Sequence, residues 1–369
     1  MIFWLAIGIC GWAILQLIIQ ITLLVFHWKD HREVLPDNLP KVSVWIALRN
    51  EEKELPRLLK SLYELDYPPE KLEFLLADDG SEDQTFSILK NWAKSGGNKT
   101  IVRLTPEDFG KYHPNGKANA LAVLGKRASG EFYFFTDGDC KVPRNWIKEG
   151  VSSIRGKTGM LIGITHVRRG EFLDQMQELD WWNTLGLVKV ITDLGLPTTG
   201  LGNNMVITRE AYEACGGFEN LSASVTEDLE ISKAVSRSGF QIKQQVSEDM
   251  LVETKAENSI STLLSQRKRW VAGAMTLSLG WKLLLAFQVF FFPAIIWLII
   301  ENMETGIRLW VLKIAMQSIF IVFIAKKAKC KPPYFSLILY DFYLICSYGL
   351  TILYYFWPSS VTWKAREYP

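Results

Sequence analysis

Hydrophobic residues are distributed unevenly along this chain, with long uncharged stretches at both ends and a mixed pattern between them. Residues 2–26 contain no charged side chain, and a helix of that length can span a hydrocarbon core of ~30 Å at 1.5 Å per residue. Three more apolar runs follow late in the chain, at 283–300, 309–325 and 335–357. We therefore expect an N-terminal transmembrane anchor at 1–28 and a C-terminal membrane region at 283–369 with about three spans.

Two other interpretations of these runs are less well supported. A secretory signal peptide would carry a basic leader and a small-residue cleavage site, and we identify neither near residues 1–28. A soluble helical bundle would also bury apolar helices, and Lys313 and Asp341 interrupt two of the runs. Three apolar runs beside an N-terminal anchor nevertheless favour a membrane protein.

Basic residues next to the apolar runs predict the orientation of the chain. They follow the first run at 27–32 and the third at 326–331, and Lys and Arg prefer the cytoplasmic side. We expect a multi-pass protein of the cell membrane, with a cytosolic domain at 33–256 and an interfacial region at 257–282. The basic tail at 363–366 would then lie outside, against the rule. Either the bias is weak there, or one C-terminal segment is re-entrant or interfacial.

The middle of the chain alternates between short apolar runs and helical patterns. Leucines at 55, 58, 59, 62 and 65 have the spacing of a helix face. Strands are expected at 42–48, 73–77, 100–104 and 131–136, and helices near 55–65, 86–93 and 117–127. This alternation predicts an α/β domain with a mainly parallel central sheet that is covered by helices on both faces.

Polar clusters follow three of the expected strands. Arg49, Asn50 and Glu51 come after the first strand, whereas Asp78-Asp79 and Asp137-Gly-Asp139 come after the second and fourth. Ligands of parallel sheets bind outside the carboxyl ends of the strands, so we expect these clusters to converge. Crowded carboxylates without nearby His or Cys suit Mg²⁺ or Mn²⁺. An isolated Asp-x-Asp could equally be an ordinary strand-ending turn.

Three further segments have both a structural and a functional interpretation. Lys117 at a predicted helix start is either a solvated lysine or a ligand for a diphosphate. Thr226-Glu227-Asp228 is either a helix start or the site of a general base at Asp228. The segment 265–270 is either a basic membrane anchor or part of a binding site.

Overall composition adds only exclusions. The net charge of +2 gives no reason to expect a nucleic-acid partner. The five cysteines show no paired spacing, so we expect neither a disulfide framework nor a zinc site.

Taken in order, these segments resemble the membrane-bound family 2 glycosyltransferases, which have the GT-A nucleotide-sugar fold. The resemblance covers residues 42–270 and includes ceramide glucosyltransferase-like and polysaccharide synthase-like members. Its motifs are Arg49-Asn-Glu, Asp78-Asp-Gly-Ser, Gly116-Lys-Ala-Asn-Ala-Leu, Asp137-Gly-Asp, Thr226-Glu-Asp and Gln266-Arg-Lys-Arg-Trp270.

The resemblance implies a role for each matching residue. Asp228 would be the catalytic base for an inverting transfer without a covalent intermediate, and Asp139, with Asp137, would ligate the metal. Donor binding would use Arg49, Asn50, Glu51, Asp78, Asp79, Lys117, Asp137, Gln266, Arg269 and Trp270. Acceptor binding would use Glu227, Gly202, Asn203, Asn204 and Trp270.

The expected partners are a nucleotide-sugar donor, a UDP-sugar before others, a lipid or saccharide acceptor, and the bilayer. We favour single transfer to a lipid or membrane-linked hydroxyl, because about four spans are few for a secretion pore. A small processive polysaccharide synthase is the alternative. A non-catalytic membrane binding protein on the same scaffold ranks lower, because the acidic residues and Arg269 are all retained.

Overall fold

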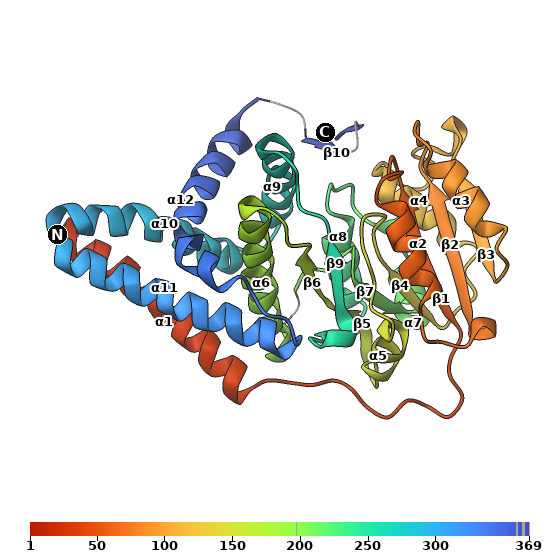
Figure 1. The fold of residues 1–369 in the computed structure, drawn as a ribbon, viewed down its shortest axis with the longest axis horizontal. Helices are drawn as coiled ribbons and strands as arrows, with labels where there is room; N and C mark the ends of the chain where they lie inside the picture. Colours follow the sequence, from red (N-terminus) through yellow and green to blue (C-terminus); the bar gives the residue numbers. More distant parts are fainter. Residues whose placement is uncertain (197, 359–360, 364–365, 369) are drawn as a thin grey trace.

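The computed structural model describes residues 1–196, 198–358, 361–363 and 366–368. At its centre is a seven-stranded sheet with the strand order β3-β2-β1-β4-β7-β5-β8 (Figure 1). The strands are β1 Val42–Leu48, β2 Leu72–Asp78, β3 Lys99–Arg103, β4 Phe132–Phe135, β5 Thr158–Ile162, β7 Met205–Thr208 and β8 Gln241–Gln244. Strands β6 Ile164–Val167 and β9 Leu251–Thr254 form a small parallel sheet, and β10 Val361–Trp363 pairs with β11 Arg366–Tyr368.

The half of the sheet built from β1 to β4 is parallel throughout. Strand β1 pairs in parallel with β2 and β4, and β2 pairs in parallel with β3. Strand β7 is antiparallel to both β4 and β5, whereas β5 and β8 are parallel. The expected α/β architecture with a mainly parallel sheet is therefore confirmed.

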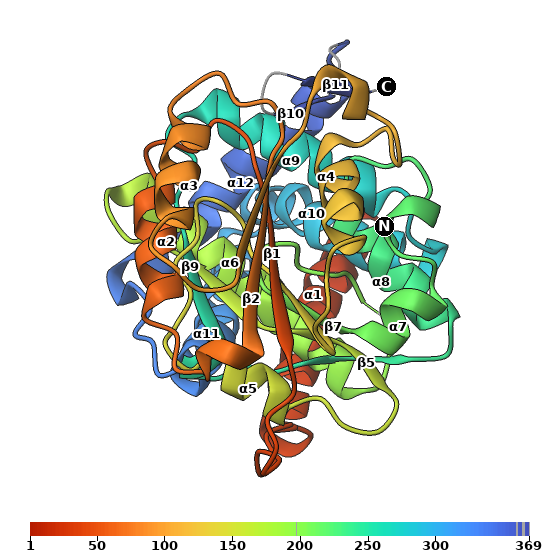
Figure 2. The same ribbon diagram turned by 90° about the vertical axis from the view of Figure 1, so that its right-hand side faces the viewer.

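Alternation along β1 divides the core into two layers. Val44 and Ile46 pack on the side of α2 Leu55–Tyr63 and α3 Thr85–Ala93. Trp45 and Ala47 point to the other face, where α4 Gly116–Gly125 and its neighbours lie. Figure 2 shows α2 and α3 on one side of the sheet and α4, α7 and α8 on the other. The remaining helices of this domain are α5 Trp146–Ser152, α7 Arg209–Ala214 and α8 Glu227–Arg237, with 3-10 turns at Pro69–Lys71, Pro106–Asp108, Phe218–Asn220 and Glu248–Met250.

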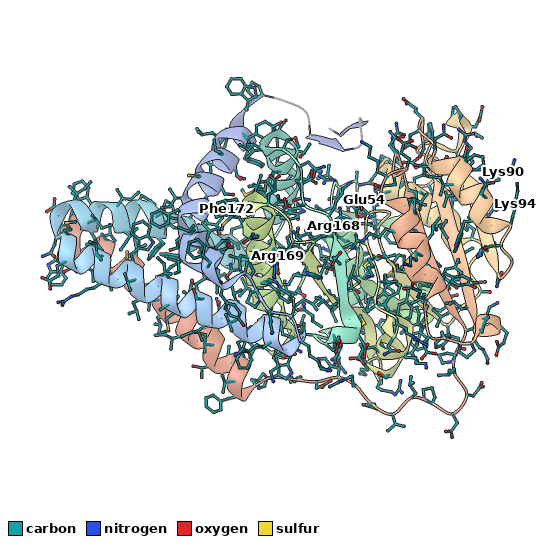
Figure 3. The ribbon with its side chains drawn as sticks, in the orientation of Figure 1. Glu54, Lys90, Lys94, Arg168, Arg169 and Phe172 are labelled. Atoms are coloured by element: carbon teal, nitrogen blue, oxygen red, sulfur yellow. The ribbon has the colours of Figure 1, made fainter. Side chains whose placement is uncertain are left out.

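Helices α6 Phe172–Asp193 and α9 Ile260–Ala274 lie between the sheet and the apolar helices. Just before α6, two adjacent arginines contact different parts of the chain (Figure 3). Arg168 donates to Glu54 at the start of α2, with 3.0 Å between Nη2 and Oε1. Arg169 binds the buried carboxylate of Glu178 on α6 through two hydrogen bonds of 2.8 and 2.7 Å. These contacts hold the beginning of α6 against the globular domain.

Four helices of the described residues are long and apolar enough to cross a membrane: α1 Ile2–Phe26, α10 Leu279–Glu301, α11 Met303–Lys327 and α12 Tyr334–Phe356. All four apolar runs of the sequence are therefore helices, each within a few residues of the expected bounds. Helices α1, α10 and α11 pack against one another, whereas α12 packs mainly against α6 and α9.

Candidate functional site

The polar clusters that follow β1, β2 and β4 lie at one edge of the sheet. These three strands are parallel neighbours, so their carboxyl ends point the same way. Two of the loops are linked directly, because Arg49 donates from Nη1 to the carbonyl oxygen of Asp79 at 2.8 Å. Asn50 has a φ of +52°, and its Oδ1 accepts from the backbone of Glu82 at 2.9 Å. Arg49 and Asn50 thus hold the first two loops together.

Asp78 is the last residue of β2 and is completely buried. One of its carboxylate oxygens lies 3.5 Å from Nε of Arg103, at the end of the neighbouring strand β3. The other accepts a long hydrogen bond of 3.4 Å from the backbone of Ser81. The structure thus places Asp78 beneath the loop that contains Asp79.

Gly138 allows the two aspartates around it to approach the first loop. A Cβ at this position would lie 2.5 Å from Leu48 and 2.7 Å from Glu51. Asp139 and Glu51 face a common basic residue, Lys255, whose Nζ lies 3.6 and 3.8 Å from their carboxylates. Burial favours the neutral amine, but Asp139 and Glu51 hold the pKa of Lys255 above its ordinary value.

Lys117 connects the β4 loop to the start of α8. Its Nζ lies 2.6 Å from Asp137 and 3.0 Å from Glu227. Burial alone would lower the pKa of Lys117, but these two carboxylates raise it well above its ordinary value. Asn115 caps the beginning of α4, the helix that contains Lys117. Its side chain accepts from the backbone N–H of Ala118 at 3.1 Å and so fixes Lys117 in the first turn.

Asp228 lies beside this lysine, in the first turn of α8. One carboxylate oxygen accepts from the backbone N–H of Gly202 at 3.1 Å, and the other accepts from that of Leu229 at 2.8 Å. Burial, followed by the nearby carboxylate of Glu227, raises the pKa of Asp228 to about 6. A carboxylate with such a pKa is ionised at neutral pH and can still accept a proton.

Two glycines bring the loop before β7 against this turn of α8. A Cβ on Gly200 would lie 2.3 Å from the backbone oxygen of Asp228, and one on Gly202 would lie 3.0 Å from Nζ of Lys117. Larger residues would therefore push the loop away from the carboxylate.

Helix α9 contributes the residues of the Gln-x-x-Arg-Trp segment. The amide of Gln266 donates to Glu257 at 3.2 Å, and Trp270 packs edge-on against Trp181 of α6 at 5.7 Å between ring centroids. Burial lowers the pKa of Arg269, while Glu227, Glu257, Asp137 and Asp228 act in the opposite direction. Its buried Nε has no hydrogen-bond partner in the described part of the chain. Such an orphaned donor is suited to a ligand oxygen.

Asn203 and Asn204 are buried and bind other segments of the domain. Asn204 is completely buried, donates to the carbonyl oxygens of Ile164 and Met250 at 2.8 Å each, and accepts from Trp146 at 3.0 Å. Asn203 is also buried and accepts from Thr165 at 3.1 Å. In this structure both side chains join segments of the domain to one another.

The charges of the cluster fit a divalent cation. Five carboxylates surround three basic side chains: Glu51, Asp137, Asp139, Glu227 and Asp228 with Lys117, Lys255 and Arg269. Carboxylate oxygen is the donor type that Mg²⁺ and Mn²⁺ prefer. Lys255 lies between two of these carboxylates, where a cation would also be attracted.

Sequence reasoning did not identify Lys255, Trp181 or Glu257. Lys255 directly follows β9, and the alternating segment Leu251-Val-Glu-Thr254 is the signal that could have indicated this strand. Because β9 pairs with β6 outside the main sheet, its end reaches the site from another direction.

This architecture is the GT-A fold of glycosyltransferases. The solved structure of the mannosyltransferase PcManGT from Pyrobaculum calidifontis, in complex with GDP-Man and Mn²⁺, has the same fold with a TM-score of 0.65 and 18% identity. The match covers 97% of this chain and 99% of the mannosyltransferase chain.

The chain belongs to glycosyl transferase family 21, whose model matches residues 8–369. The expected resemblance to membrane-bound, ceramide glucosyltransferase-like enzymes is thereby confirmed, with family 21 as the matching family. The β-monoglucosyldiacylglycerol synthase of Nostoc sp. is 25% identical over 267 residues, which are 70% of this chain and 54% of the synthase. Glycosyltransferase AglE of Haloferax volcanii is 31% identical over 212 residues, 56% of this chain and 65% of AglE. The chain thus spans about half the length of the synthase.

Proposed function

We propose that this protein transfers one sugar from a nucleotide sugar to a hydroxyl group of a lipid acceptor, with inversion at the anomeric carbon. The observation that carries this proposal is Asp228, whose carboxylate has a raised pKa and is held by two backbone N–H groups beside Lys117. The names of the relatives support a lipid acceptor, because the Nostoc enzyme is a synthase of glucosyldiacylglycerol.

In the proposed reaction, Asp228 removes the proton of the acceptor hydroxyl. The resulting oxygen attacks the anomeric carbon, and the bond from that carbon to the diphosphate breaks on the opposite face. Lys117 and Arg269 stabilise the negative charge of the leaving nucleoside diphosphate. Asp139 and Asp137 would hold Mg²⁺ or Mn²⁺, which when bound neutralises part of the diphosphate charge.

The donor end of the site is proposed from the strand loops. Glu51, Asp78 and Asp79 lie at the carboxyl ends of β1 and β2, where nucleotides bind in parallel sheets. A UDP-sugar is the donor to test first. Trp270, which is 40% exposed, would line the acceptor entrance together with Gly202 and Glu227. We further propose that this domain faces the cytosol.

Transfer assays with the full-length protein in lipid nanodiscs test this proposal. The nanodiscs contain diacylglycerol or ceramide, and radiolabelled UDP-glucose, UDP-galactose, UDP-N-acetylglucosamine or GDP-mannose is supplied with Mn²⁺ or Mg²⁺. We expect the label to enter an organic-soluble product that contains one sugar. A long water-soluble polymer would instead identify a processive synthase, and binding without transfer for every donor would identify a non-catalytic protein.

Two neutralising substitutions in α8 provide the matched comparison. Asp228→Asn removes the proposed base, whereas Glu230→Gln changes a carboxylate two residues further on that pairs with Lys233 at 2.7 Å. Only the first should abolish transfer. Equal loss in both variants would contradict the assignment of the base.

A further inference from the structure

Helix α12 differs from the other three apolar helices in its packing and direction. Helices α1, α10 and α11 form a bundle, whereas α12 packs mainly on α6 and α9. Figure 1 shows α12 running across the direction of α1 and α11, alongside α6 and α9. Length and composition alone do not distinguish α12 from a fourth span.

Both ends of α12 are hydrogen-bonded to helices of the globular side. At its beginning, Ser336 donates to Gln175 of α6 at 2.6 Å. Just beyond its end, the carbonyl oxygen of Trp357 accepts from Lys268 of α9 at 3.0 Å. A helix of 23 residues is about 34 Å long, so a crossing would place these ends on opposite sides of the bilayer.

The middle of α12 is bound to the same two helices, and Asp341 also binds Lys313 and Trp310 of α11. Tyr340 donates to Asp180 of α6 at 3.0 Å, and Arg267 of α9 donates to Tyr343 at 2.9 Å. If α12 crossed the membrane, α6 and α9 would have to accompany it. Their charged residues exclude this, since α6 contains Glu178 and Asp180 and α9 contains three consecutive basic residues at 267–269.

The outer face of α12 is an uncharged stripe. Exposed positions recur every three or four residues along it, at Phe335, Ile338, Phe342, Cys346, Gly349, Leu353 and Phe356, and Tyr334, Leu350 and Ile352 are exposed as well. The opposite, buried face is mixed: it contains Ser336, Asp341, Ser347 and Thr351 together with Leu337, Tyr340 and Leu344. The charged residue and most polar residues of the helix thus face the protein, and the outward face is uncharged and largely apolar, which is the arrangement of a helix in contact with lipid acyl chains.

We infer that α12 lies flat in the leaflet that faces the globular domain, and that the chain crosses the membrane three times. In this position the outer stripe of α12 contacts the acyl chains of that leaflet. The same lipid surrounds α1, α10 and α11. The hairpin β10–β11 then lies on the side of the globular domain, in agreement with the packing of β10 against α9.

This placement of α12 also accounts for the distribution of basic residues on either side of it. Lys326, Lys327 and Lys331 precede α12, and Arg366 lies in β11. With three crossings, all of these residues are on the side of the globular domain, as the bias of Lys and Arg toward one side requires. With four crossings, Arg366 would be on the opposite side.

Cysteine labelling of the intact chain in cells tests the number of crossings. In a background with the native cysteines replaced, Glu304→Cys marks the first turn of α11, and Glu367→Cys marks β11. We expect a membrane-impermeant maleimide to label Glu304→Cys in intact cells and Glu367→Cys only after permeabilisation. Labelling of both in intact cells would overturn the inference.

The depth of α12 in the bilayer is a second measurement, and it does not depend on the position of β10 and β11. Spin labels at residue 338, at the native Cys346 and at residue 353 are compared by their accessibility to oxygen and to a water-soluble nickel complex. A flat helix gives similar, shallow depths at all three sites. A spanning helix gives the greatest depth at Cys346, and that profile would overturn the inference.

Discussion

Buried lysines occur both in the acidic cluster of the candidate site and in the helical bundle, and they are neutralised in different ways. In the bundle, Lys313 of α11 pairs with Asp341 of α12 and donates to Gln317 at 2.5 Å. Asp341 also accepts from Trp310 at 2.9 Å. One cation therefore meets one anion, and the cavity beside the pair, about 40 Å³, has room for about two or three water molecules.

In the acidic cluster of the candidate site, the charges are not balanced in this way. Lys117 alone contacts Asp137 and Glu227, and Asp228 lies beside them with a pKa raised to about 6. Because carboxylates outnumber basic groups there, the cluster can accept a cation together with an anionic ligand. A buried charge that is paired with an opposite charge within the protein supports the structure. An excess of negative charge is retained where a bound ligand or cation neutralises it.

The largest effect that would sharpen this comparison is loss of the proposed base. Asp228→Asn should lower the transfer rate by about 10³-fold, since an amide cannot accept the hydroxyl proton. Nucleotide binding in Mn²⁺ should stay nearly unchanged, because Asp137 and Asp139 are intact. Single-turnover transfer and calorimetric titration with the nucleoside diphosphate measure the two properties. Normal turnover by this variant would refute the role of Asp228.

The second effect concerns the balanced pair in the bundle. Lys313→Met leaves Asp341 buried without its cation and should destabilise the protein by about 3–5 kcal/mol, seen as a lower Tm in detergent. Lys313→Met with Asp341→Leu should recover most of this loss, but not all, because Trp310 also loses its acceptor. Activity at low temperature should persist in both variants.

Arg308→Met serves as the control on the same helix. Arg308 is exposed and pairs with the exposed Glu304, so its removal should cost less than about 1 kcal/mol. A loss for Lys313→Met as small as that for Arg308→Met would show that the bundle pair is not a structural requirement.

The sequence predicted the first half of the sheet better than the second. Strands β1, β2 and β4 are mostly apolar, as expected for parallel strands buried on both faces. Between residues 158 and 254 no strand was predicted, although β5 to β9 lie there; β6, Ile-Thr-His-Val, and β9, Leu-Val-Glu-Thr, mix apolar with polar residues. Strand β8, Gln-Ile-Lys-Gln, is also polar at the edge of the sheet.

The candidate site shows the same division. Residues directly after the predicted strands were recognisable from the sequence, and so was the acidic start of α8. Lys255 was missed because it follows β9, a strand of the small sheet that was not predicted. Asn203 and Asn204 were expected at the acceptor, but sequence alone could not indicate that both side chains bind buried groups of the domain.

A pH titration should show the third effect. The pKa of Asp228 is raised by folding, so the base is protonated and inactive below about pH 6 and ionised above it. The value of kcat/KM should therefore fall about tenfold per pH unit below pH 6. Rates in Glu230→Gln should follow the same curve. An acid limb below pH 4.5 would show that another group with an ordinary pKa acts as the base.

The same shift predicts the stability of the Asn variant. A raised carboxylate pKa means that the folded state binds a proton more tightly than the unfolded state, so stability is lost as the pH rises from about 4, the ordinary carboxyl value, to about 6. Asp228→Asn should raise the Tm by about 2–4 °C at pH 7.5 and by about half as much at pH 5. A variant that is less stable at both pH values would show that the carboxylate is needed for the fold.

The smallest effect concerns Lys255, which faces Asp139 and Glu51 in the position that a metal ion would compete for. Lys255→Met removes this competitor and should lower the Kd for Mn²⁺ by about three- to tenfold in the absence of nucleotide, which corresponds to about 0.7–1.4 kcal/mol. Electron paramagnetic resonance of free Mn²⁺ measures the change directly.

Lys243→Met is the control, since Lys243 lies in β8 at the far edge of the sheet. If Lys255→Met weakens Mn²⁺ binding, Lys255 does not compete with the metal ion but orients the carboxylates that bind it. The excess of negative charge in the cluster is then smaller than the number of its carboxylates indicates.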